Sequence, residues 1–178
     1  MKTILLFLLI SISAFSQKKM VLVEGFQEVG EKFYTNEPDL VYSILEEFIA
    51  ENHLRGTSVL EKLQKLDSVV VSDLGYTITP PFISKVYGKL SRIGINNTIA
   101  IDVVLLKDEA KFKKTFYHEL GHFFGLEHIE VDKLPLDDPK CFEVMSNRKS
   151  PYYNQVLQEA AIENYYKDIH KILMPKTN

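Results

Sequence analysis

Three of the five histidines in this 178-residue chain lie within eleven consecutive residues, at His118, His122 and His128. Glu119 directly follows the first, and Gly125 lies between the second and the third. On a helix, His118 and His122 lie on one face about 40° apart, so their imidazoles can share one Zn²⁺ at roughly 2.0–2.1 Å. Glu119 lies about 100° around the helix, where it can reach a water on that ion but cannot easily ligate it. The spacing predicts a zinc site with a general base beside it.

Gly125 and His128 extend this prediction. A glycine can take the left-handed conformation that ends a helix, and the chain can then turn back to bring His128 to the ion as a third ligand. Three protein ligands leave one position for water, which is typical of a catalytic zinc. The alternative is that the histidines are polar surface residues. Because this pattern would arise by chance on the order of 10⁻⁵ times per chain of this composition, we favour the metal site.

The helix that positions these histidines is expected over residues 109–124, with Gly125 at its end. Its opposite side is apolar and carries Phe112, Phe116, Leu120 and Phe123. That side would anchor the helix in the core, while the histidines open toward a cleft.

The remaining elements follow from hydrophobic spacing. Further helices are expected at 38–55, 58–66 and 156–173. Strands are expected at 20–23, 69–71, 76–79, 86–90 and 99–106. Gly88 indicates an edge strand or a bulge, whereas 99–106 is apolar on both faces apart from Asp102, as in a buried strand. Residues 129–150 are expected as loop, and 17–178 as a single domain.

Composition and charge narrow the possibilities. The chain is 46% hydrophobic, which is enough for one core and excludes disorder as its general state. A net charge of −3, from 21 basic and 24 acidic residues, argues against nucleic-acid binding. The single cysteine, Cys141, excludes an intrachain disulfide and the Cys₂His₂ and Cys₄ zinc fingers. We expect Cys141 to be a buried small hydrophobe.

The first sixteen residues have the pattern of a secretory signal peptide. Lys2 precedes an apolar run at 4–12, and Ala14 and Ser16 are the small residues of a cleavage site before Gln17. The run is shorter than the roughly 20 residues that span a bilayer. We therefore expect a secreted or periplasmic protein without a stable membrane anchor, the alternative being an uncleaved N-terminal anchor.

The zinc pattern, together with Met145 in the segment 141–146, resembles the metzincin zinc metallopeptidases. In that family a tight turn containing a methionine follows the zinc motif, and the methionine lies beneath the metal without ligating it. The resemblance implies that role for Met145; ordinary core packing is the alternative. It is strongest over residues 98–146.

The resemblance implies an α+β, zincin-like fold. Such a fold has a twisted mixed β-sheet with an edge strand, a backing helix, an active-site helix and a C-terminal helix. A small matrixin-like or archaemetzincin-like catalytic domain is the nearest description. Asn147 replaces the tyrosine that some members have two residues after the methionine, and Ile129 after His128 fits none of the best-known subfamilies. Nothing in the sequence assigns Tyr152 or Tyr153 to the metal.

The activity implied is that of a secreted, monomeric zinc endopeptidase acting on a peptide or protein. One zinc would polarise the substrate carbonyl, and Glu119 would take a proton from the metal-activated water and pass it to the leaving amine. An extended substrate would pair with the edge strand at 86–90 or its neighbour. The alternatives are a zinc exopeptidase of narrow scope and a non-enzymatic binding module, against which the retained Glu119 argues.

Other polar residues have simpler interpretations. A Ca²⁺ site is conceivable at the loop acids Asp132, Asp137 and Asp138, although we favour a solvated acidic loop. The lysines of the zinc-site region are interpreted as a solvated helix face; they are Lys107, Lys111, Lys113 and Lys114.

Overall fold

A computed structural model describes residues 34–79, 82–93, 96–131, 133–135, 137–146 and 155–174. The predicted signal peptide at 1–16 and the predicted strand at 20–23 lie outside these residues and stay predictions. No described helix has the length and apolar character needed to cross a membrane.

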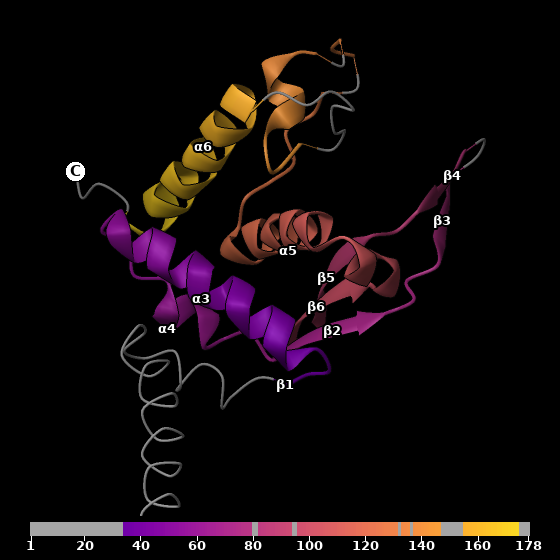
Figure 1. Cartoon of the computed structure of the whole chain (residues 1–178), viewed down its shortest axis with the longest axis horizontal. Coiled ribbons are helices and arrows are strands. Elements are labelled where there is room, and N and C mark those ends of the chain that lie inside the picture. The colour runs from indigo at the N-terminus through magenta and orange to yellow at the C-terminus, as the bar shows by residue number, and fades with distance from the viewer. Residues whose placement is uncertain are drawn as a thin grey trace, which may run out of the picture.

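The fold is a mixed sheet with four α-helices, which confirms the α+β prediction at that coarse level (Figure 1). The helices are α3 Pro38–Leu54, α4 Leu60–Leu63, α5 Glu109–Phe124 and α6 Gln155–Leu173. The strands are β1 Tyr34–Thr35, β2 Ser68–Ser72, β3 Tyr76–Thr79, β4 Phe82–Lys85, β5 Gly88–Ile93 and β6 Asn96–Asp102. There are also two described 3₁₀ helices. η1, Val103–Lys107, directly follows β6, and η2, Pro139–Phe142, lies between α5 and α6.

The main sheet has the order β1-β2-β6-β5. β1, β2 and β6 are parallel, whereas β5 runs antiparallel to β6, with Leu90 opposite Ile99. β5 is therefore an edge strand of the described sheet, as Gly88 indicated. β3 and β4 form a separate antiparallel hairpin that projects from the body of the molecule in Figure 1.

Two strand predictions need correction. The strand expected at 99–106 ends at Asp102, because the Asp102 side chain accepts a hydrogen bond from Val104 N–H and caps η1. The edge strand expected at 86–90 runs instead from Gly88 to Ile93. β4 was not predicted, since nothing in a four-residue segment directly after two prolines separates a strand from a loop.

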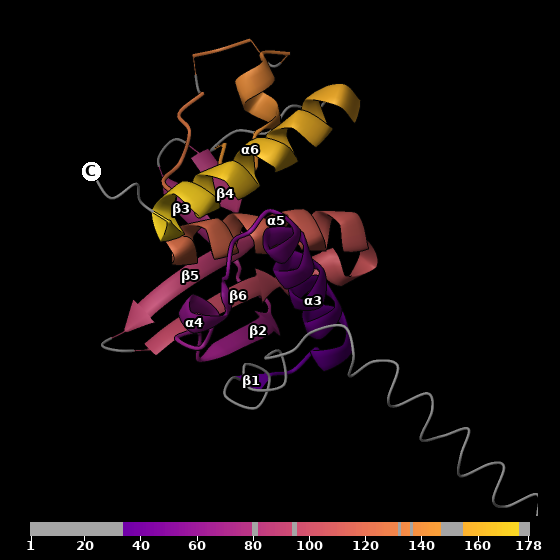
Figure 2. The same cartoon turned by 90° about the vertical axis from the view of Figure 1, so that its left-hand side faces the viewer.

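Helix α5 lies between the sheet and α6 (Figure 2). The four residues predicted to anchor it, Phe112, Phe116, Leu120 and Phe123, are all buried. On the α6 side, the Tyr165 hydroxyl donates to the Tyr117 carbonyl at 2.6 Å, and the two rings stack. The helix is thus fixed from both sides, which leaves little freedom for the residues on its remaining face.

Candidate metal centre

Local sequence explains where α5 begins and ends. Asp108 caps its start by accepting a hydrogen bond from Lys111 N–H. Gly125 ends it with φ of 102°, and the next N–H, from Leu126, donates to the Gly121 carbonyl at 2.8 Å. The left-handed conformation predicted for Gly125 is confirmed. It reverses the chain and brings His128 back to the helix.

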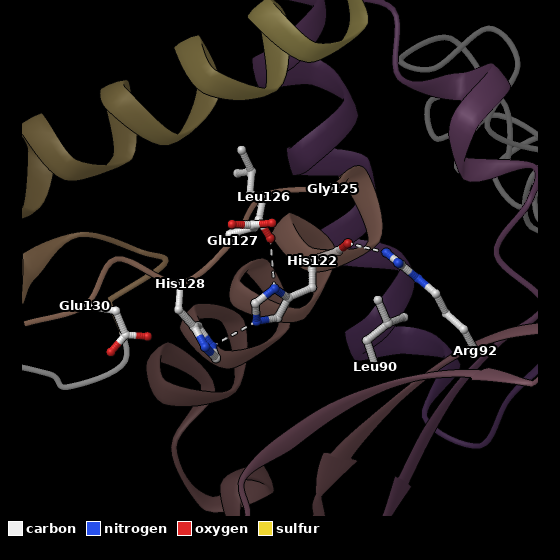
Figure 3. A pocket seen from close by; sticks show the side chains of 8 residues that line it. All are labelled: Leu90, Arg92, His122, Gly125, Leu126, Glu127, His128 and Glu130. Atoms are coloured by element: carbon white, nitrogen blue, oxygen red, sulfur yellow. Dashed lines mark hydrogen bonds between the residues drawn. The ribbon is translucent and has the colours of Figure 1, made fainter.

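The three predicted histidines converge. His128 Nε2 lies 3.0 Å from His118 Nε2 and 2.9 Å from His122 Nε2, and Figure 3 shows His122 and His128 side by side. Two nitrogens at roughly 2.0–2.1 Å from one tetrahedral zinc are about 3.3 Å apart. The separations are a few tenths of an ångström shorter than that, so the three side chains lie close enough to hold a metal ion.

Hydrogen bonds set the tautomers of two of these imidazoles. His118 Nδ1 lies 2.8 Å from the Val144 carbonyl oxygen, and His122 Nδ1 lies 2.9 Å from that of Leu126. A carbonyl oxygen can only accept, so each Nδ1 carries a proton, and in the neutral imidazole Nε2 then keeps its lone pair. Neutral imidazoles held in this way have the donor chemistry of zinc ligands.

A loop after α5 supports two of the ligands. Val144 supplies the carbonyl for His118, and Met145 O accepts from the N–H of Ile129, the residue after His128, at 2.9 Å. Met145 is buried, and its Sδ lies where a Cβ on Gly121 would be only 2.3 Å away. Met145 therefore packs against α5 at Gly121, between His118 and His122 in the sequence. Sequence reasoning missed the Val144 carbonyl, because backbone acceptors leave no mark in the side-chain pattern.

Glu119 is buried between α5 and β5. Its side chain is 6% exposed, and its carboxyl group accepts a hydrogen bond from Leu90 N–H. Burial raises the pKa of Glu119 to about 7, against the opposing effect of that hydrogen bond. Gly88 makes room for it, since a Cβ there would lie 2.6 Å from Glu119 Oε1.

An open pocket of about 750 Å³ lies beside the histidines. Figure 3 shows its lining, which comprises Leu90, Arg92, His122, Gly125, Leu126, Glu127, His128 and Glu130. Arg92 on β5 donates to the His122 carbonyl at 2.6 Å and so ties the edge strand to the end of α5. The pocket is therefore bordered by an edge strand and by two of the histidines.

Other predicted residues have structural roles or lie outside the described part. Cys141 is buried, as expected, and its thiol donates to the Pro135 carbonyl. Asp138 caps η2, and Asp137 directly precedes it in the chain. Among the described residues, the histidine triad is the only group of three or more potential ligands that could hold a metal ion. Four residues that the sequence analysis considered lie outside the described part, namely Asp132, Asn147, Tyr152 and Tyr153.

Comparisons with known protein families, with curated proteins and with solved structures found no match to this chain. The described residues provide three converging imidazoles, a buried carboxyl group on the residue after the first of them, and an edge strand beside both. Such an arrangement can hold a metal ion, move a proton next to it and admit an extended chain.

Proposed function

We propose that this chain is a zinc-dependent endopeptidase with a zincin-like, metzincin-type catalytic domain. The observation that carries the proposal is the convergence of three Nε2 atoms, two of them on imidazoles whose Nδ1 protons go to backbone carbonyls. His118, His122 and His128 would hold the zinc. When bound, zinc supplies Lewis-acid polarisation of the peptide carbonyl and lowers the pKa of a water molecule.

Glu119 is the general base and acid in this proposal. It takes a proton from the attacking water and delivers it to the leaving amine. Its place on the residue after His118 sets its carboxyl group beside the histidine face, and burial makes it a stronger base than an exposed glutamate. The Met145 side chain packs against α5, and its backbone carbonyl accepts from Ile129 N–H, so Met145 supports the loop that carries the partners of His118 and of the residue after His128 without ligating the metal.

The edge strand β5 is the proposed docking site for an extended substrate. The Leu90 N–H donates to the Glu119 carboxyl group, so the edge of β5 that does not pair with β6 faces the acid–base residue. A peptide added to this edge as a further strand would pass in front of Glu119 and the histidines.

Metal analysis and peptide-library cleavage test the proposal together. The zinc-loaded protein should bind one zinc per chain and cut peptides internally. Glu119→Ala should keep the zinc and lose cleavage, whereas His122→Ala should lose the zinc itself. Full activity of Glu119→Ala, or stoichiometric zinc in His122→Ala, would refute the assignments. Terminal trimming would indicate an exopeptidase instead, and bound zinc without cleavage would indicate a binding module.

A further inference from the structure

A second, smaller pocket of about 190 Å³ lies between α5 and α6. The residues of its lining that matter here are Lys113, Lys114, Tyr117, Val144, Gln158 and Ile162. Its volume is below the roughly 300–1,000 Å³ of most small-molecule sites. It suits one side chain or one chain end.

The pocket is directly linked to a metal ligand. Val144 lines it, and the Val144 carbonyl is the hydrogen-bond partner of His118 Nδ1. Lys114 lies one turn before His118 on the same side of α5, about 6 Å away along the helix axis. Glu119 and β5 border the other side of the histidine face. A peptide that pairs with β5 across the metal centre would therefore have this pocket on its opposite side.

Lys114 differs from the neighbouring lysines with which the sequence grouped it. Lys111 pairs with Asp108 at 2.9 Å, and Lys113 pairs with Glu47. Lys114 is half-buried, and within the described part of the chain its ammonium has no hydrogen-bond or ion-pair partner. Burial lowers its pKa, and among the described residues no carboxylate compensates the lost hydration.

Gln158 adds a second donor to the lining of the pocket. The Tyr117 hydroxyl already accepts a hydrogen bond from Tyr166, whereas Gln158 makes no hydrogen bond with its side chain within the described residues. Val144 and Ile162 are apolar. The Lys114 ammonium and the Gln158 side-chain amide thus line a small, partly apolar pocket without a hydrogen-bond partner among the described residues, and a carboxylate could accept from both.

We propose that Lys114 is a specificity-determining residue, which selects peptides with a carboxylate next to the bond that is cut, with Gln158 as a second donor. The inference rests on the proposed peptidase function. The carboxylate can belong to an acidic side chain or to the C-terminus of the peptide, and the chemistry of recognition is the same.

Matched peptides separate these two sources. In the first pair, the two peptides differ only in having Glu or Gln beside the cleaved bond, and both have an amidated C-terminus. In the second pair, neither peptide has an acidic residue, and both end one residue after the cleaved bond. One of these two ends as a free acid and the other as an amide. The wild-type protein should favour a carboxylate by roughly tenfold to a hundredfold in kcat/KM. A preference in the first pair identifies a side chain. A preference in the second pair identifies a chain end, and the enzyme would then be the exopeptidase alternative with the same carboxylate site.

Three variants assign the preference to Lys114. Lys114→Met should bring the ratio of acid to amide toward one, and Lys114→Arg should restore most of it. Lys111→Met, a change at a more exposed lysine of the same helix, should keep the wild-type ratio. An unchanged ratio in Lys114→Met, or no preference in the wild type, would overturn the inference.

A binding measurement keeps this test separate from the peptidase proposal. Amide shifts in NMR spectra can follow N-acetylglutamate amide and N-acetylglutamine amide, neither of which has to be cleaved. The acid should bind the wild type more tightly than the amide does, and Lys114→Met should abolish the difference. If no peptide is cut but this difference is observed, the peptidase proposal fails and the carboxylate site stands. Equal binding of the two compounds refutes the site.

Discussion

Two buried carboxylic acids, Asp102 and Glu119, differ in the number of hydrogen bonds that their carboxyl groups accept. Asp102 is 0% exposed at the end of β6. Its Oδ2 accepts from Leu74 N–H at 2.9 Å and from the Lys85 ammonium at 2.8 Å, and its Oδ1 accepts from Val104 N–H at 3.0 Å. Burial by itself would raise its pKa, but the ammonium and the two N–H groups together hold the pKa below its ordinary value.

Glu119 is 6% exposed, yet its carboxyl group accepts from one backbone N–H, that of Leu90, and no cation of the described residues faces it. Its pKa is raised rather than lowered. The difference shows that burial alone does not decide whether a carboxyl group is structural or can transfer a proton. Asp102 is paired so completely that its charge joins the base of the β3–β4 hairpin to the sheet. Glu119 keeps the capacity to take up and release a proton.

The largest expected effect is that of Glu119→Gln on activity. The amide keeps the shape and can still accept from Leu90 N–H, but it cannot take a proton from water. We expect kcat/KM to fall by roughly 10²–10⁴, with zinc content and melting temperature at or above those of the wild type. Steady-state cleavage, metal analysis and thermal unfolding measure these three quantities.

Glu109→Gln is the matched control, because Glu109 is an exposed acid in the first turn of the same helix. It should leave all three quantities unchanged. Wild-type turnover in Glu119→Gln would mean that Glu119 is a second structural carboxylate like Asp102.

Gly88→Ala should give the next largest effect. The new Cβ would lie 2.6 Å from Glu119 Oε1 and 2.8 Å from Thr115 Cγ2, so the carboxyl group must move. A displacement of this size can cost about a hundredfold in kcat, and the crowding costs about 1–3 kcal/mol of unfolding free energy. Lys89→Ala, at the exposed neighbouring position of β5, should have neither effect.

A double-mutant cycle shows whether Gly88 acts through Glu119. In the Glu119→Gln background, Gly88→Ala should reduce the residual activity only slightly, because the proton-transferring group is already lost. A full hundredfold loss in that background would show that Gly88 supports activity by another route.

The contrast between the carboxylates also marks what the sequence could predict. The end of α5, the histidine spacing and the return of His128 depend on residues within eleven positions of one another, so local rules were sufficient. The partners of Asp102 depend on the tertiary fold, since Lys85 and Leu74 are distant in sequence. Its only signal was an acid in an apolar run. The lack of a partner for Lys114 among the described residues left no signal in the sequence, because a solvated and a half-buried lysine share the same helical spacing.

Asp102→Asn tests the structural half of the comparison. The amide keeps one carbonyl oxygen but turns its NH₂ group toward the donors of the other oxygen, and it removes the buried charge that pairs with Lys85. We expect a loss of about 2 kcal/mol in the unfolding free energy, measured by urea denaturation. Asp73→Asn, which removes the exposed partner of the same lysine, should cost much less. Equal losses in the two variants would contradict the special role of the buried acid.

The smallest expected effect is the pH dependence of the unfolding free energy that Asp102→Asn loses. Because the pKa of Asp102 is lower in the folded than in the unfolded protein, its charge contributes full stability above the ordinary aspartate pKa of about 3.9. The contribution disappears as the pH falls through the lowered folded-state pKa, where both states are protonated. In metal-free protein, the stability gap between wild type and Asp102→Asn should therefore be constant near neutral pH and close in acid. A gap that persists at the lowest pH at which both proteins fold would show that packing, and not charge, distinguishes Asp102.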